Sequence, residues 1–346
     1  MSEPTRSFAL TLKEEGFTTT TPSGPYVESL DPYLEATEVE VPAPGEGQVL
    51  IRLIMSPVNP SDVHFIKGEY GLPRVRGDVA GFEGCGEVVA AGAGGEELVG
   101  QRVAFTRAKT GTGAWSEFVL GEARSCIALP EAIKDEDAAA FFVNPLTAVG
   151  MINEVVNTKS SAVIITAGAS QLSKLMVGLA RDRDLTSIVL VRRASQIQAL
   201  KDLGATHVLD QTSASFADDL KALIAESKPR VLLDAVADEV SSKVFFAMPS
   251  RSRWLIYGLL DTKPTVLDQL GQLIFMGKSI EGFWLSSWLP ALEDNARRQV
   301  FGEVVDRFVR GVWHTDVREQ IPLREAHARL PKAMEGANVG KVMIVP

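Results

Sequence analysis

The stretch Ala162–Ser173, AVIITAGASQLS, decides the fold that we expect for this chain. Its first six residues are a short apolar run of the kind that forms a fully buried strand. The turn after it keeps Gly168, as a dinucleotide fingerprint does, but has Ser170 and Ser173 at the second and third glycine positions of that fingerprint. The turn alone also suits a plain strand–turn–helix without a ligand. Its place between a strand and a helix favours a nucleotide site, because a helix N-terminus offers N–H groups to an anion.

Strands and helices alternate in the sequence beyond this turn. The next buried-strand runs are SIVLV, HVLD, VLLDAV and RWLIYG, and helices are expected at 170–180, up to about 203, and at 216–226. This alternation is typical of a parallel, doubly wound sheet of the Rossmann type. The segment SIEGFWL, at 279–285, is expected to be the last strand of that sheet.

The two ends of the chain have a different texture. The first 130 or so residues are rich in short strand patterns, expected at 48–55, 84–90, 102–105 and 115–120. The tail has an amphipathic helix around 300–309, a strand at 318–323, a helix from 324 and a final strand GKVMIVP. These tail elements need a sheet to join. The expected fold class is therefore α/β, with a Rossmann domain at 131–284 inserted into a discontinuous β-rich domain formed by 1–130 and 285–346.

The cofactor is expected to be selected about 20 residues beyond the glycine turn. Proteins that bind NAD place Asp or Glu there, on the ribose 2′-hydroxyl. This chain has Arg192 and Arg193 instead, and guanidinium groups make bidentate contacts with phosphate. We therefore expect NADPH; the alternative is a solvated basic pair at a helix start. The residues expected around the pyrophosphate are Gly168, Ser170, Gln171 and Leu172.

Composition limits the partners and the compartment. The 346 residues carry a formal net charge of −9, which disfavours nucleic acid as a partner and leaves a small anion possible. Cys85 and Cys126 form no CxxC pair and are expected to be reduced thiols. The chain has no apolar run of about 20 residues, so no membrane contact is expected. Its first residues lack the pattern of a signal peptide, and a cytoplasmic location is expected.

Four segments resemble the zinc-independent branch of the medium-chain dehydrogenase/reductase superfamily. They are VNPSDVHFIKGEYGLP at 58–73, FFVNPLTAVGMI at 141–152, LIFMGKSIEGFWLSSWL at 273–289 and GKVMIV at 340–345. The resemblance is strongest to 2-enoyl thioester reductases, and quinone oxidoreductases share much of the pattern. It implies that the β-rich domain is a GroES-like substrate domain. It also implies a homodimer, in which the strand at 279–285 pairs with its own copy and so covers an apolar sheet edge.

The same resemblance predicts that no metal is bound. Zinc-dependent alcohol dehydrogenases of the superfamily have Cys-His where this chain has Asn59-Pro60, and Gly-His-Glu where it has Gly81-Phe82-Glu83. Asn and Phe cannot replace thiolate and imidazole ligands. A lone histidine, His64, is interpreted as structural. Without a Lewis acid, the expected acceptor is an activated one, namely a conjugated C=C bond or a quinone.

The resemblance also implies roles for single residues. Tyr70 would give a proton to the carbon α to the thioester carbonyl after hydride has reached the β carbon, and Asn59 would lie near the nicotinamide or the substrate. Packing is the alternative for each aromatic residue. The alternative functions are quinone reduction without a proton from Tyr70, and a cofactor-binding scaffold without catalysis. The further cofactor contacts that the resemblance implies are Thr147, Tyr257, Gly258, Phe283, Trp284 and Lys341.

Overall fold

The computed structural model describes residues 6–18, 23–263, 265–335 and 340–346, and the chain divides into two compact units. Unit 1 combines Met1–Val143 with Glu303–Pro346, and unit 2 is Asn144–Gly302. One unit is thus inserted within the sequence of the other. The domain boundaries expected from the sequence, after 130 and after 284, lie 13 residues before Val143 and 18 residues before Gly302.

Unit 2 contains a six-stranded parallel sheet with the order β10-β9-β8-β11-β12-β13. Numbered from its own first strand, this is the order 3-2-1-4-5-6 of a Rossmann sheet, which confirms the expected fold class. The apolar run at Ala162 becomes a central strand whose four residues are fully buried. The strands are β8 (Ala162–Ile165), β9 (Thr186–Val191), β10 (His207–Asp210), β11 (Val231–Asp234), β12 (Arg253–Ile256) and β13 (Ser279–Gly282).

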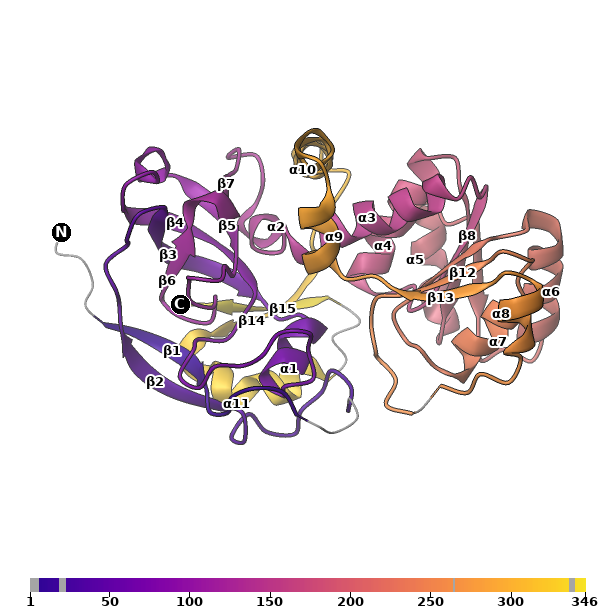
Figure 1. Cartoon of the computed structure of the whole chain (residues 1–346), viewed down its shortest axis with the longest axis horizontal. Helices are drawn as coiled ribbons and strands as arrows, with labels where there is room; N and C mark the ends of the chain where they lie inside the picture. The colour runs from indigo at the N-terminus through magenta and orange to yellow at the C-terminus, as the bar shows by residue number, and fades with distance from the viewer. Residues whose placement is uncertain (1–5, 19–22, 264, 336–339) are drawn as a thin grey trace. The chain divides into compact units, whose positions relative to one another are not determined.

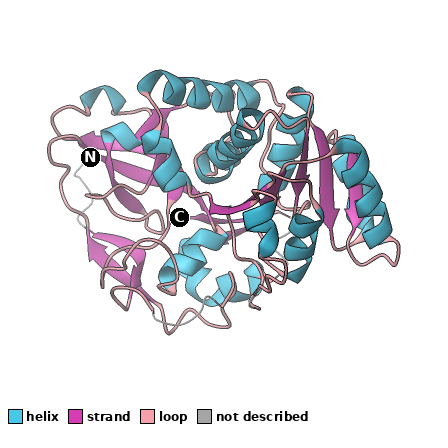
Figure 2. Cartoon of the chain, turned by 45° about the vertical axis from the view of Figure 1, so that its right-hand side comes forward, coloured by secondary structure: helices cyan, strands magenta, loops and turns pink. Residues whose placement is uncertain are grey.

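Helices lie on both faces of this sheet (Figure 2). Each crossover between parallel strands carries a helix, as the alternation in the sequence predicts. Strand residues such as Ile164 and Leu232 pack against Phe245 of α7 and Leu220 of α6 in one core cluster. The helical segments are α3 (Val143–Asn157), α4 (Gln171–Asp182), η3 (Ala194–Gln196), α5 (Ile197–Asp202), α6 (Phe216–Ser227), α7 (Glu239–Ala247), α8 (Gly271–Phe275), α9 (Leu285–Ala291) and α10 (Asp294–Val309), the last continuing into unit 1.

The last strand is shorter than expected. The prediction of a strand through residue 285 is wrong, because β13 ends at Gly282 and Leu285 begins α9. The backbone N–H of Phe283 still donates to the carbonyl of Ile256 at 2.8 Å, so the chain leaves the sheet only after that residue. The aromatic pair Phe283 and Trp284 links the strand to the helix. The expected position of this strand, at the edge of the sheet, is correct.

Unit 1 holds a seven-stranded sheet and a separate pair of strands (Figure 1). The sheet order is β14-β15-β3-β4-β5-β7, with β6 pairing with β3, and β1 pairs with β2. The C-terminal strand β15 therefore joins the N-terminal sheet, as expected for the tail. The strands are β1 (Arg6–Leu12), β2 (Leu34–Glu40), β3 (Gln48–Pro57), β4 (Glu83–Ala91), β5 (Arg102–Thr106), β6 (Phe118–Glu122), β7 (Cys126–Ala128), β14 (Val317–Pro322) and β15 (Lys341–Val345).

One strand of unit 1 begins later than expected, and short helices complete the unit. The strand expected from residue 115 begins only at Phe118, because Trp115 and Ser116 pair instead with the segment around β1. Trp115 is fully buried there. The helices are α1 (Pro60–Ile66), η1 (Glu96–Leu98), η2 (Ala123–Ser125), α2 (Asp135–Ala139) and α11 (Leu323–Met334).

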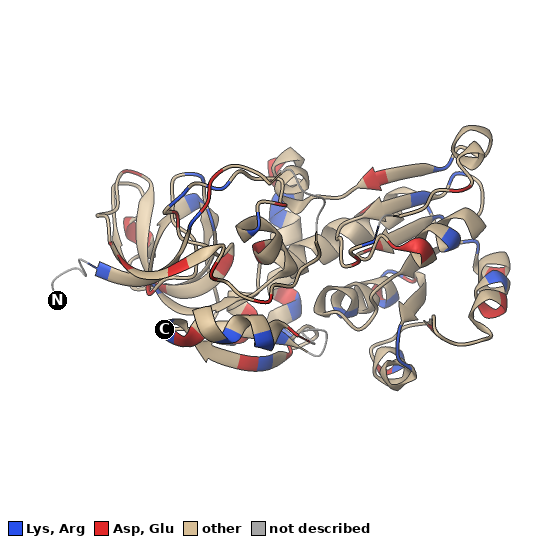
Figure 3. Cartoon of the chain, turned by 90° about the horizontal axis from the view of Figure 1, so that it is seen from below, with Lys and Arg blue, Asp and Glu red and all other residues tan. Residues whose placement is uncertain are grey.

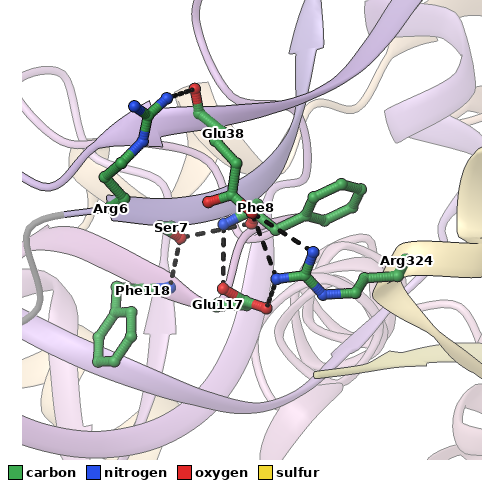
Figure 4. A network of polar contacts seen from close by, with 7 residues as sticks. All are labelled: Arg6, Ser7, Phe8, Glu38, Glu117, Phe118 and Arg324. Carbon is green, nitrogen blue, oxygen red and sulfur yellow. Dashed lines mark hydrogen bonds and ion pairs between the residues drawn. The ribbon is translucent and has the colours of Figure 1, made fainter.

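A polar network ties the C-terminal helix α11 to the N-terminal strands (Figure 4). Arg324 donates to Glu117 at 2.8 Å and to Glu38 at 3.4 Å, and its guanidinium carbon lies 4.6 Å from the centre of the Phe8 ring. Glu117 in turn accepts the backbone N–H of Phe8 at 3.0 Å. Most of these groups are exposed, so we expect the ion pairs to contribute little to stability.

Charged residues of both signs are mixed along the ribbon of each unit (Figure 3). Within the described residues, no helix is long and apolar enough to cross a membrane. Cys85 and Cys126 are free thiols, as expected. Burial raises the pKa of both thiols to about 12, so they stay protonated at neutral pH.

Candidate functional site

The turn at Gly168 lies beyond the carboxyl end of the central strand β8. Its tightness explains the glycine, because a Cβ atom at this position would lie 2.3 Å from Cγ1 of Val189. The backbone N–H of Gly168 donates to the carbonyl of Leu190 at 2.9 Å. The turn is thus pressed against strand β9, as the first glycine of a dinucleotide fingerprint requires.

Two serines replace the other fingerprint glycines and bond to each other. Ser170 is the N-cap of α4: its Oγ accepts the backbone N–H of Ser173 at 3.2 Å and donates to Oγ of Ser173 at 2.9 Å. Ser173 Oγ donates to the carbonyl of Thr166 at 3.1 Å. The serines therefore shape the turn, and Gln171 and Leu172 form the first turn of α4, where helices leave N–H groups for an anion.

Arg192 and Arg193 follow strand β9 directly, and both are exposed. Strands β8 and β9 are parallel neighbours, so the arginine pair and the Gly168 turn both lie beyond the carboxyl ends of the strands. Among the described residues, neither guanidinium makes a hydrogen bond or ion pair within the chain. Together these groups fit NADP(H): a turn without room for a side chain, a helix N-terminus and two available guanidinium groups.

Asp234 is a further polar residue at the carboxyl ends of these strands, and the sequence analysis did not identify it. It ends strand β11 and is fully buried. Its carboxylate accepts Oγ1–H of Thr166 at 2.6 Å and Nε1–H of Trp254 at 2.8 Å. It also accepts the backbone N–H of Val236 and of Ala237, each at 3.0 Å. Five donors, with Ser241 Oγ as the fifth, fix the loop beyond β11. An Asp at the end of a buried strand is the sequence signal for such a group.

The remaining cofactor residues expected in unit 2 are distributed over three elements. Tyr257 and Gly258 follow strand β12 at the same carboxyl edge, and the backbone N–H of Tyr257 donates to the carbonyl of Asp234 at 2.9 Å. Thr147 is buried on α3. Phe283 packs its ring on Gly150 of α3, with its centroid 5.7 Å from that of Trp288, and Trp284 is the N-cap of α9. Their cofactor contacts stay predictions.

Unit 1 contains a buried polar cluster around Asn59. Asn59 Nδ2 donates to Glu83 Oε1 at 2.9 Å, and Lys341 Nζ donates to Asn59 Oδ1. The other oxygen of Glu83 accepts the backbone N–H groups of residues 142 and 143, each at 2.9 Å. Asp62 accepts the backbone N–H of Asn59 at 2.8 Å and that of Phe82 at 2.9 Å. The four side chains, from α1, β4, β15 and the residue before α1, are all buried.

Burial controls the charges in this cluster. It raises the pKa of Asp62 to about 7, and it raises the pKa of Glu83 although the ammonium group of Lys341 opposes the change. Burial likewise lowers the pKa of Lys341, against the attraction of the two carboxylates. Two carboxyl groups thus face one ammonium group, and burial favours the protonated form of both carboxyl groups. The structure engages Lys341 in this cluster, and its expected cofactor contact stays a prediction.

The cluster does not suit a zinc ion. The positions of the Cys-His and Gly-His-Glu ligands carry Asn59 and Phe82, which supply no thiolate or imidazole. A cation, the ammonium group of Lys341, already lies on Asn59. Within the described parts of the chain, no group of three or more His, Cys, Asp or Glu residues is arranged to hold a metal ion.

Tyr70 lies four residues beyond the end of α1, in unit 1. It is half-buried, and its ring centroid is 5.1 Å from that of Phe82, which is in turn 5.0 Å from that of Phe65. Phe82 directly precedes Glu83 of the buried cluster. Asn59 thus precedes helix α1, and Tyr70, the candidate proton donor, follows it. The ring of Tyr70 contacts Phe82, and the next residue, Glu83, is bonded to Asn59.

Two family models match the chain. The alcohol dehydrogenase GroES-like domain matches residues 45–131, and the zinc-binding dehydrogenase family matches residues 172–307. A solved structure from Mesorhizobium loti, provisionally named NADPH:quinone reductase, is 46% identical, with a TM-score of 0.93 and full coverage of both chains.

Enoyl reductases are similar over most of the chain as well. The bovine mitochondrial enoyl-[acyl-carrier-protein] reductase is 29% identical over 301 residues, which are 84% of this chain and 79% of the relative. The structure of the Etr1p complex with NADP and crotonyl-CoA has a TM-score of 0.80 at 22% identity and covers 99% of this chain and 100% of its own. At that identity, the likeness to Etr1p concerns the fold.

Proposed function

Because the chain belongs to the medium-chain dehydrogenase/reductase superfamily, we propose that it reduces an activated C=C bond, in a 2-enoyl thioester or an enone, with NADPH. It is an oxidoreductase of the enoyl reductase and quinone reductase type. The choice of acceptor rests on two features that occur together in unit 1. Asn59, bonded to Lys341, stands at a position where a zinc-dependent enzyme has a metal ligand. The ring of Tyr70 packs against Phe82. A phenol then takes the place of a Lewis acid as the electrophilic group.

The proposed reaction divides the work between the two units. NADPH, when bound, supplies the hydride. In unit 2, Arg192 and Arg193 hold the 2′-phosphate, and the turn at Gly168 with the start of α4 holds the pyrophosphate. In unit 1, Tyr70 donates its phenolic proton to the α carbon of the enolate that hydride addition at the β carbon leaves. A phenol is a weak acid, so it is suited to protonate an enolate and not to act as a base at neutral pH.

Quinone reduction with the same cofactor is the second candidate function. Its support is the 46% identical relative from Mesorhizobium loti, which is provisionally named NADPH:quinone reductase. A quinone takes two electrons and can obtain its protons from water. This reaction needs the nucleotide site of unit 2 and does not need Tyr70.

A comparison of acceptors separates the two functions. Initial rates with NADPH are measured on crotonyl-CoA, on a simple enone and on phenanthrenequinone. The proposal expects kcat/KM to be highest for crotonyl-CoA or the enone. A rate confined to phenanthrenequinone supports the second function, and no turnover with any of them contradicts both.

The proposal includes a homodimer. Strand β13 is the edge of the described unit 2 sheet, and the helix α8 that precedes it exposes Ile274 and Phe275, which are 76% and 85% accessible. Such apolar groups beside an open sheet edge are typical of a surface that is covered in the assembly. A second copy related by a two-fold axis would cover both features at once. The cytoplasmic location stays a prediction.

A further inference from the structure

Glu69, the residue directly before Tyr70, is a buried hydrogen-bond centre that the proposed function does not use. Its side chain is only 4% accessible. Its carboxylate accepts Oγ–H and backbone N–H of Ser23, at 3.0 and 3.2 Å. Nζ of Lys67 lies 3.3 Å from it, and Nδ1 of His64 lies 3.2 Å from it. Three separate segments, the loop at 23, helix α1 and the turn after α1, thus meet at one carboxylate.

The charges favour an ionised Glu69. Burial alone would raise its pKa, but the hydrogen bonds from Ser23 and the charge of Lys67 outweigh burial and lower it. Lys67 also donates to the carbonyl of Gly24 at 2.7 Å, so its ammonium group fixes the same loop. The donors thus pair with a charged acceptor, and such charge-assisted hydrogen bonds are stronger than neutral ones.

His64 completes the arrangement as a neutral donor. Its Nε2 is buried and has no partner among the described residues, whereas Nδ1 faces Glu69. The proton is therefore best placed on Nδ1, from which it is donated to the carboxylate. Burial lowers the pKa of His64, which agrees with a neutral ring.

The segment that carries Tyr70 has a second anchor on its other side. Arg74 donates to the carbonyl of Ile66 at 3.1 Å and to that of Gly16 at 3.1 Å. The backbone N–H of Glu69 donates to the carbonyl of His64 at 2.8 Å. In the sequence, Tyr70 thus lies between two anchored residues, Glu69 and Arg74, and Glu69 is its direct neighbour.

We propose that Glu69 is a positioning residue for Tyr70: its carboxylate, held by Ser23, His64 and Lys67, fixes the backbone from which the phenol reaches the substrate. This inference rests on the proposed role of Tyr70. It assigns to His64, which the sequence suggests only as a structural residue, a place in the support of the proton donor. Misplacing a catalytic group by about 1 Å can cost roughly a hundred-fold in rate.

The test is a double-mutant cycle with Glu69→Gln and Tyr70→Phe, measured on crotonyl-CoA with NADPH. Glu69→Gln keeps the size of the side chain and removes the charge that Lys67 and His64 face. We expect kcat to fall by roughly ten- to a hundred-fold, with the KM for NADPH unchanged. Tyr70→Phe should lower kcat by about 10²–10⁴-fold. In the Tyr70→Phe background, Glu69→Gln should have almost no further effect, because its effect passes through the phenol.

Two further variants separate positioning from stability. Glu122→Gln is the matched control, since Glu122 is also a buried carboxylate of unit 1, with Thr110 and Arg124 as donors. It should lower the melting temperature and leave kcat unchanged. Ser23→Ala removes one donor from an exposed position, so the chain should fold, and kcat should fall a few-fold.

The outcomes distinguish the two levels of the proposal. If Tyr70→Phe leaves kcat unchanged, the proposed role of Tyr70 fails, and the inference fails with it. If Tyr70→Phe lowers kcat but Glu69→Gln and Ser23→Ala do not, the role of Tyr70 stands and the positioning role is overturned. The positioning role would also be overturned if Glu69→Gln lowered kcat by the same factor in the Tyr70→Phe background as in the natural protein.

Discussion

At the scale of single residues, charge decides what each site can accept. In unit 2 two exposed guanidinium groups stand where an acidic residue would favour a free 2′-hydroxyl. In unit 1 an ammonium group and an amide stand where zinc ligands would be expected. The first arrangement favours a phosphorylated cofactor. The second does not suit a zinc ion, and in the proposed reaction a phenol takes the place of a Lewis acid.

Replacing both Arg192 and Arg193 by Ala should weaken the use of NADPH far more than that of NADH. A charge-assisted hydrogen bond contributes about 1.5–3 kcal/mol, so kcat/KM for NADPH should fall by at least ten-fold. Initial rates with each cofactor at fixed acceptor measure the effect. Arg298→Ala, which removes an exposed charge elsewhere in unit 2, is the control. An unchanged preference for NADPH in the double variant would mean that the arginines do not bind the 2′-phosphate.

The buried carboxyl of Asp62 should make stability depend on pH. Its pKa is raised from 3.8 to about 7 by burial, so between these values the folded chain binds more protons than the unfolded chain. The free energy of unfolding therefore falls as pH rises from about 4 to about 7, by an amount on the order of a few kcal/mol. Asp62→Asn removes this titration. Glu83, whose pKa is also raised, still titrates in the variant. Urea unfolding across that range should therefore show a steeper decline in the natural protein than in the variant, and parallel curves would contradict it.

At the scale of elements, the sequence predicts those whose pattern is local. The apolar runs of β8 and β11 are strands that are buried throughout, and β9, β10 and β12 are buried in part. The alternating helices follow from their length and periodicity. The local pattern fails where tertiary contacts decide the structure. Ser116 of the segment WSEFVL forms an isolated bridge with Ala9 of β1. The segment GFWL leaves the sheet, since Trp284 is the N-cap of α9. The cluster of Asn59, Glu83 and Lys341 joins residues up to 282 positions apart, which no local pattern reveals.

The Gly168 turn offers a test at this scale. Gly168→Ala would place a methyl group 2.3 Å from Cγ1 of Val189, so β9 or the turn must move. Overpacking of this kind costs about 1–3 kcal/mol, and displacement of the turn should weaken NADPH binding. Gly302→Ala is the matched control, because a Cβ there meets no atom within 4 Å. Fluorescence titration with NADPH and thermal unfolding measure both effects. Equal behaviour of the two variants would show that the turn has room.

At the scale of the whole molecule, the proposed function gives each unit its own task, nucleotide binding in unit 2 and acceptor chemistry in unit 1. The discontinuous chain is closed by β15, which pairs with β3, and by the contacts of α11 with the N-terminal strands. The sequence predicts this insertion because its two ends share a texture that the middle lacks.

The open edge of unit 2 should be a dimer interface. Phe275→Asp places a charge on the most exposed apolar side chain of α8, so it should convert a dimer into a monomer. Sedimentation at micromolar concentration measures the mass of each form. Val156→Asp, at an exposed apolar position of α3, is the control and should stay dimeric. A natural protein that is already monomeric under these conditions would contradict the prediction.

The central claim is that NADPH reduces a C=C bond, with hydride added at the β carbon and a proton at the α carbon. Following the two hydrogens tests it most directly. Crotonyl-CoA is reduced once with NADPH deuterated at C4 in ordinary water, and once with ordinary NADPH in heavy water, and the product is analysed by NMR. We predict saturated butyryl-CoA, with cofactor deuterium only on the β carbon and solvent deuterium only on the α carbon. Absence of the saturated product, or cofactor deuterium on the α carbon, would contradict the account.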